Sequence, residues 1–147
     1  TEAELIERYD RVDDALNATK AAIQEGILPG GGVALARVSR NIAIAQQEIK
    51  DDAVRAGMSI LIQACLQPFR QIILNGGKDP ASYLDKIEMS DVDVGFDFRN
   101  DKFGNMFDLG IVDPFKVTRC ALENSVSAAA ALLSVGSAMI EENIASS

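Results

Sequence analysis

The most distinctive residues for binding form the run Pro29-Gly30-Gly31-Gly32, which separates two helix-like segments. Three successive glycines lack Cβ atoms, so their backbone N–H groups can approach a partner closely. A helical apolar rhythm resumes at Val33, and unpaired N–H groups at a helix start favour an anion or a polar ligand. The run lacks the Lys-Ser/Thr ending of a P-loop. It predicts either a plain turn between helices or a backbone wall against a nucleotide.

A pair of carboxylates, Asp13-Asp14, lies within the segment 2–25, which contains no Gly or Pro. Adjacent charges on a helix are typical of a solvated face. Alternatively, one carboxylate positions or activates a water molecule, or helps to hold a cation such as Mg²⁺. The sequence leaves both interpretations open.

The dipeptide Asp113-Pro114 is a typical start of a helix, with Asp as N-cap and Pro at the first helical position. A carboxylate beside a ligand could also accept hydrogen bonds from ribose hydroxyls. The two roles do not exclude each other, because a carboxylate has two oxygens.

The composition excludes several kinds of site. The chain has no His, which removes Ser-His and Cys-His nucleophiles, and its two cysteines cannot form a usual zinc site without His. We interpret Cys65 and Cys120 as reduced, buried thiols. A net charge of −8 and the lack of basic runs argue against a nucleic-acid partner. Any chemistry must depend on carboxylates, backbone groups and a bound ion.

The length of 147 residues, 48% of them hydrophobic, fits one domain or one domain with a small appendage. The chain starts with Thr1 and shows no signal peptide, so we expect a piece of a longer protein. The apolar run 126–140 is too short and too rich in Ser and Ala to span a bilayer, so no membrane partner is expected.

Most of these residues must be positioned by helices. Residues 2–25 show one apolar face at helical spacing, and Gly26 is a plausible stop. Further helices are predicted at 33–47 and 51–64, then at 69–74 after a bend or restart at Pro68, and at 81–87 with Asp79 as cap. The apolar face of the first helix consists of Leu5, Tyr9, Val12, Leu16 and Ile23.

One region departs from the helical pattern. Alternation on both sides of the polar set 99–102 predicts a β-hairpin over 94–107, followed by a connector at 109–112. The last helix is predicted from Phe115 to about Glu141, and its small apolar middle, 125–135, is expected to be buried. Hairpin and core packing is expected of the four phenylalanines Phe96, Phe98, Phe103 and Phe107.

Two long blocks of this sequence closely resemble the GroEL-type (group I) chaperonins. The first is RVDDALNATKAA at 11–22 with EGILPGGGVAL at 25–35; the second is FGNM at 103–106, GIVDP at 110–114 and KVTR at 116–119. The resemblance covers nearly the whole chain. It implies a mainly α fold, the multi-helix C-terminal half of an equatorial domain with one small β-hairpin. Residues 1–25 resemble the C-terminal helix of the intermediate domain, and 26–147 the C-terminal half of the equatorial, ATP-binding domain.

The resemblance also implies site residues. Asp14 matches the aspartate that serves ATP hydrolysis at the attacking water. Gly31, beside Gly32, matches the glycine that contacts the nucleotide, and Asp113 matches the aspartate that binds ribose. Asp97 and Phe98 fall on the loop beside the adenine, where the family often has Asn-Ala-Ala, so this chain is bulkier there. We expect Gly31 and Asp113 to meet on one concave surface.

The resemblance further implies a protein-folding ATPase of two stacked seven-membered rings, using ATP or ADP with Mg²⁺. Its partners are other subunits and, through domains not in this sequence, unfolded clients and a co-chaperonin. The phosphate-binding stretch with its Mg²⁺-ligating aspartate is not in this sequence either, so no metal ligand is expected here and the chain alone is expected to be inactive. A bacterial cytoplasm is expected, with mitochondrial matrix or plastid stroma as alternatives. The alternative function is a non-enzymatic helical interaction module.

Overall fold

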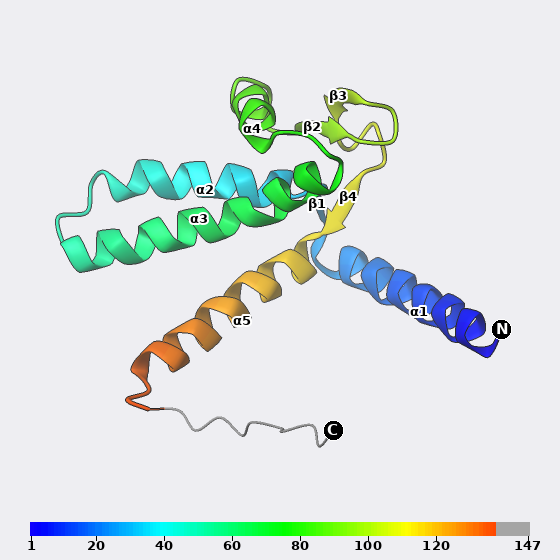
Figure 1. The fold of residues 1–147 in the computed structure, drawn as a ribbon, viewed down its shortest axis with the longest axis horizontal. Helices are drawn as coiled ribbons and strands as arrows, with labels where there is room; N and C mark the ends of the chain where they lie inside the picture. The colour runs from blue at the N-terminus through cyan, green and yellow to red at the C-terminus, as the bar shows by residue number, and fades with distance from the viewer. Residues whose placement is uncertain (138–147) are drawn as a thin grey trace, which may run out of the picture.

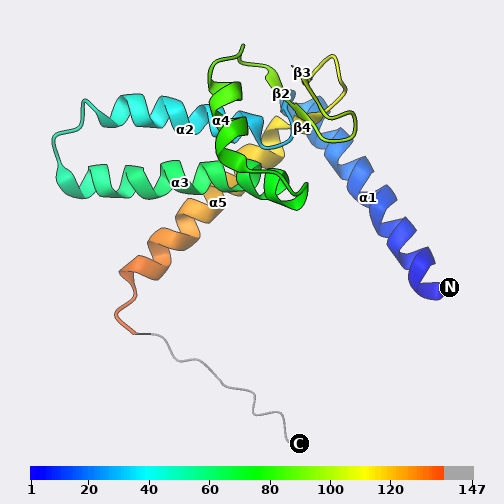
Figure 2. The same ribbon diagram turned by 45° about the horizontal axis from the view of Figure 1, so that its top comes forward.

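The computed structural model describes residues 1–137, and it is mainly helical as predicted (Figure 1). The helices are α1 (Glu2–Glu25), α2 (Val33–Gln46), α3 (Asp52–Asn75), α4 (Pro80–Glu88) and α5 (Phe115–Ser134). The strands are β1 (Ile27–Pro29), β2 (Val94–Asp97), β3 (Lys102–Asn105) and β4 (Val112–Pro114). In both ribbon views α1, α5 and the α2–α3 pair leave a common junction in different directions (Figures 1 and 2).

Helix α1 confirms the prediction for residues 2–25. Its first turn is closed by a capping box, in which the Thr1 side chain accepts from the Glu4 N–H and the Glu4 side chain accepts from the Thr1 backbone. It ends at Gly26, whose φ of 90° is open to glycine. No residue of α1 is buried, and its predicted apolar face is exposed to solvent along its whole length.

Helices α2 and α3 pack as an antiparallel pair. Of the predicted bend or restart at Pro68, the restart is wrong, because one helix runs through Pro68 from Asp52 to Asn75. Pro68 is exposed, whereas Cys65, Phe69 and Ile73 are buried on the opposite side. A proline removes one helical hydrogen bond. Here that loss falls on the solvent side, so core packing keeps the helix continuous.

The core lies where the start of α2, the second half of α3, α4 and the β2–β3 hairpin meet. Its buried members are Val33, Ala36, Phe69, Ile73, Ile87, Phe96 and Met106. The short helix α4 begins at Pro80 and is capped by Asp79, which accepts from the Ala81 N–H at 3.3 Å, as predicted.

The predicted β-hairpin is present, with β2 and β3 antiparallel and Phe96 opposite Phe103. Phe96 is buried, while Phe98 and Phe103 pack against the core from its edge. Phe107, expected in the same packing, is instead exposed.

A second two-stranded sheet pairs β1 with β4. In place of β4 the sequence predicts the end of a connector at Val112 and a helix start at Asp113-Pro114. Three-residue strands show too little alternation to be recognised by period. The Gly30 N–H donates to the Ile111 carbonyl at 2.9 Å, and the Phe115 N–H donates to the Gly26 carbonyl at 3.0 Å. This sheet ties the ends of α1 and α2 to the start of α5.

Helix α5 differs from its prediction in two ways. Asp113 is not its N-cap: Pro114 holds that position without a side-chain hydrogen bond, because Asp113 belongs to the extended β4 ladder opposite Leu28. The small residues at 125–135 are exposed rather than buried, since the main contacts of α5 in the described chain are with α1 and β4. The predicted helix end at about Glu141 lies outside the described residues.

Among residues 1–137, no helix combines the length and apolar character needed to cross a bilayer.

Candidate functional site

The β1–β4 ladder places the glycine run and Asp113 next to each other. Leu28 pairs with Asp113 and Pro29 pairs with Val112, so the chain turns into the glycines directly beside β4. Segments 84 residues apart in sequence, counted from Pro29 to Asp113, are thereby adjacent in space. The strand pair therefore brings the start of the glycine run close to Asp113, and one concave surface shared by Gly31 and Asp113 stays a prediction.

A side chain would meet different obstacles at each of the three glycines. A Cβ on Gly30 would lie 3.0 Å from the Ile111 carbonyl oxygen, and one on Gly32 would lie 2.7 Å from the Phe69 backbone nitrogen. Gly31 has a φ of 68° and faces only the end of the Met106 side chain, at 3.2 Å from its Cε. Gly30 and Gly32 are thus required by protein packing. Gly31 is explained by its positive φ, since its neighbour Met106 contributes only the end of a flexible side chain.

Asp113 is half-buried at this junction. Burial alone raises the pKa of its carboxyl, and the structure gives this carboxylate no hydrogen-bond partner within residues 1–137. A partly desolvated carboxylate with free acceptor oxygens is suited to hydroxyl donors.

Asp14 and Asp13 have different surroundings although they are adjacent. The Asp13 carboxylate accepts from the Asn17 side-chain amide at 3.1 Å along α1. Asp14 instead lines a surface recess of about 450 Å³ with Ala18 of α1 and with Pro114 and Val117 at the start of α5. Asp14 and the β4–α5 junction therefore border the same recess, and the junction residue Pro114 directly follows Asp113 in sequence.

Asp97 and Phe98 lie at the tip of the β2–β3 hairpin. The buried Asp97 carboxylate accepts from the Arg99 N–H at 2.9 Å, the Asn100 N–H at 3.3 Å and the Asn100 amide at 2.6 Å. The Asn100 side-chain bond is the main cause of a lowered pKa of Asp97. This carboxylate is committed to shaping the turn.

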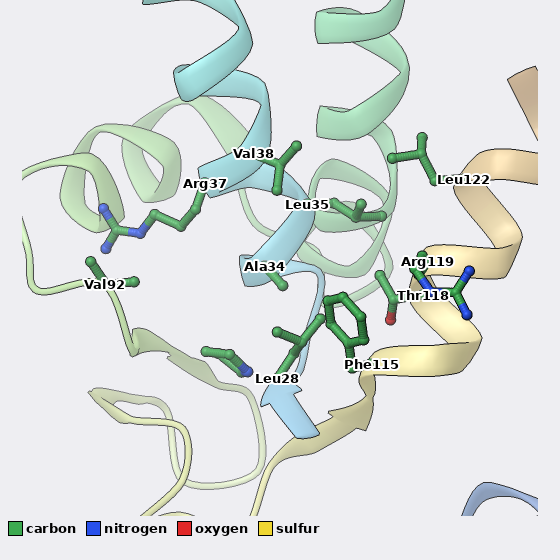
Figure 3. Close-up of a pocket in the computed structure, with 11 residues that line it drawn as sticks. Leu28, Ala34, Leu35, Arg37, Val38, Val92, Phe115, Thr118, Arg119 and Leu122 are labelled. Atoms are coloured by element: carbon green, nitrogen blue, oxygen red, sulfur yellow. The ribbon is translucent and has the colours of Figure 1, made fainter. Parts of the chain in front are cut away.

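A separate pocket of about 290 Å³ lies between β1, α2 and α5 (Figure 3). Leu28, Leu35 and Phe115 point into it, and Arg37 and Arg119 lie at its two sides. Apart from Thr118 and the two arginines its lining residues are apolar, so it suits apolar side chains. The recess beside Asp14, by contrast, has a carboxylate in its lining.

Sequence reasoning missed the contacts that attach α1 to α5. Arg119 makes a bidentate pair with Glu25, with Nε to Oε2 at 3.1 Å and Nη2 to Oε1 at 2.7 Å, and Lys116 Nζ donates to Gln24 Oε1 at 2.6 Å. The pair lowers the pKa of Glu25 and raises the pKa of Arg119. Residues this distant in sequence carry no local signal of the pairing.

Comparison with known proteins finds chaperonins that are similar over most of this chain. Residues 1–143 match the model of the TCP-1/cpn60 chaperonin family. The chain is 46% identical over 133 residues to "Chaperonin GroEL 3" of Psychromonas ingrahamii, covering 90% of this chain but 24% of that protein. It is also similar to a crystal structure of a group III chaperonin in the open state, with a TM-score of 0.73 and 27% identity over 81% of this chain and 25% of that one. A family model that spans both the glycine run and the Asp113 junction identifies the chain as a member of the TCP-1/cpn60 chaperonin family.

Proposed function

We propose that this chain supplies one wall of the ATP site of a chaperonin, a ring-shaped oligomer that assists protein folding. The observation that carries the proposal is the β1–β4 pairing, which sets the glycine run beside a half-buried carboxylate that has no hydrogen-bond partner among residues 1–137. In this proposal residues 1–25 belong to an intermediate domain and residues 26–147 to an equatorial domain. The bacterial relative favours a bacterial cytoplasm.

Each residue has a distinct role in the proposal. The Gly31 backbone contacts the nucleotide, and Gly32 allows the close approach of Phe69 that holds this backbone in place. The Asp113 carboxylate accepts hydrogen bonds from ribose hydroxyls. Asp14 orients the attacking water from across the shared recess. The turn at Asp97 and Phe98 borders the base.

Phosphoryl transfer requires a bound metal, a phosphate cradle and a group that orients the nucleophile. Of these, we assign only the last, Asp14, to the described residues. We therefore expect Mg²⁺-dependent phosphate release by the purified chain to stay at background. Turnover above background that is lost in Asp14→Ala would contradict this expectation.

Nucleotide binding is the direct test of the proposed site. Calorimetry with ADP should show weak binding by the 147-residue chain, and Asp113→Asn should raise the Kd about tenfold, because one charge-assisted hydrogen bond is lost. Asp108→Asn is the matched control, since Asp108 is exposed in the neighbouring turn. Equal losses in both variants, or no ADP binding at all, would sink the proposal.

A non-enzymatic helical interaction module is the second candidate. One specific observation favours it, an apolar groove of about 440 Å³ between α3 and α5. Its lining includes Ile60, Leu61, Leu122, Val126 and Leu133. Exposed apolar surface of this kind is typical of a protein contact site.

A further inference from the structure

The backbone conformation of Gly76, directly after α3, does not require a glycine. Its φ of −80° is open to any residue. A Cβ at this position, however, would overlap the ring of Phe98, which comes from the hairpin tip. Gly76 is therefore explained by the approach of an aromatic side chain.

The Phe98 ring is also fixed from its other side. It stands edge-on to Phe96, with ring centroids 4.8 Å apart and planes at 89°. Phe96 is itself buried in the core. The Phe98 ring therefore packs against both Gly76 at the end of α3 and Phe96 of the core.

A second link joins the same two segments. Lys78, two residues after Gly76, pairs with Asp101 on the far side of the hairpin turn and lies 4.8 Å from the Phe96 ring centroid. Together Gly76, Phe98, Lys78 and Asp101 form what we name the tip clamp. It fastens the turn on both sides to the α3–α4 connection.

The base of the hairpin is fixed to the glycine run. A Cβ on Gly95 would lie 2.6 Å from Met106 Sδ, and a Cβ on Gly31 would lie 3.2 Å from Met106 Cε. The Met106 side chain therefore fills the space between these two glycines. From Gly95 to Asp97 a strand advances about 7 Å. With both ends held, the tip has a defined position relative to Gly31.

We infer that Gly76 is a positioning residue: its missing side chain admits the Phe98 ring, and the tip clamp thereby holds the Asp97–Arg99 backbone as the base-side wall of the nucleotide site. This inference rests on the proposed function. It explains how the bulky residue Phe98 can occupy the loop beside the base, because its ring packs against Gly76 at the end of α3.

The clash at Gly76 is with the end of a movable ring, whereas the clash at Gly32 is with backbone. Gly76→Ala should therefore displace Phe98 while leaving the chain folded, with a thermal midpoint close to the wild type. Gly57→Ala is the matched control, because Gly57 lies within α3, the helix that Gly76 follows, and a Cβ there meets nothing within 4 Å.

The test is a titration of the ¹⁵N-labelled chain with ADP, in which binding is monitored by the NMR chemical shifts of the backbone amides. Gly76→Ala and Phe98→Ala should each raise the ADP Kd about five- to tenfold, and the double variant should bind no more weakly than Phe98→Ala alone, since both changes act through one ring. Gly57→Ala should leave the Kd within twofold.

The outcomes separate the two proposals. Shifts at Gly31 and Asp113 without shifts at Asp97–Arg99, an unchanged Kd in Gly76→Ala, or multiplied losses in the double variant would overturn the positioning role alone. No ADP-dependent shift at Gly31 and Asp113 in the wild type would overturn the proposed nucleotide site, and the positioning role with it.

Discussion

Two aspartates at the candidate site have opposite electrostatic situations. Asp113 is half-buried and unpartnered among the described residues, and burial raises its pKa. Asp97 is buried but accepts three hydrogen bonds, and its pKa is lowered. The same residue type is therefore available to a ligand in one place and committed to the fold in the other.

This contrast predicts opposite pH dependences of stability. A raised folded-state pKa means that the native state binds the proton more tightly than the unfolded state, so Asp113 reduces stability as the pH rises above its unfolded value of about 3.8. Asp113→Asn should therefore be more stable than the wild type at neutral pH, with the gain vanishing in acid. Urea unfolding of both proteins at several pH values measures the gain in the free energy of unfolding at neutral pH and its loss in acid.

Asp97→Asn is the control for that experiment. Its lowered pKa means that the Asp97 carboxylate contributes stability above the unfolded pKa, and that this contribution is lost as the pH falls through the folded pKa. Asp97→Asn should thus be less stable than the wild type at neutral pH, with the gap narrowing in acid. The same sign for both variants would contradict the assigned environments.

At the scale of elements, α1 is attached mainly through its last turns. Gly26 gives the chain a glycine-only backbone conformation, and the Glu25–Arg119 pair crosses directly to α5. In the proposed function Asp14 rides on this helix, so the attachment would set its distance from the nucleotide.

Arg119→Met should loosen this attachment while keeping the apolar stem of the side chain. Hydrogen exchange of amides 20–25 should accelerate roughly two- to fivefold, as expected for a partly exposed ion pair, and the difference should shrink in 1 M salt. Arg11→Met is the control, because Arg11 pairs with Glu7 within α1. Unchanged exchange in Arg119→Met would contradict a role of the Glu25–Arg119 pair in holding the helix.

At the scale of the whole molecule, much apolar surface remains uncovered. It includes the groove between α3 and α5, the pocket in Figure 3, which shares Leu122 of α5 with that groove, and the exposed face of α1. The chain spans 24% of the length of the GroEL 3 relative. Such surface favours association with other segments or copies.

Self-association should therefore depend on concentration. Light scattering across a dilution series should show a rising mean mass, and Leu133→Lys in the α3–α5 groove should weaken association at least tenfold, because a charge would be buried. Met89→Lys is the control, since Met89 is 90% exposed and outside that groove. A monomer at high concentration would contradict the interaction-module candidate.

The sequence by itself determined three of the helices and the hairpin, and it suggested the residues of the candidate site. Capping residues, helical spacing and strand alternation are local properties, so α1, α2, α4 and the β2–β3 hairpin follow from the order of residues along the chain. The run of small residues at 125–135 was local too, but its burial was mispredicted because burial depends on partners.

Only the tertiary structure decided which of these residues meet. The β1–β4 pairing joins segments far apart in sequence through strands too short to have a period, and it took Asp113 from the predicted cap into a ladder. Pro68 remains inside α3 because its lost hydrogen bond faces solvent, and Gly76 is glycine because a ring from the hairpin lies over it. These are long-range contacts, and their energies have no counterpart in any local stretch of sequence.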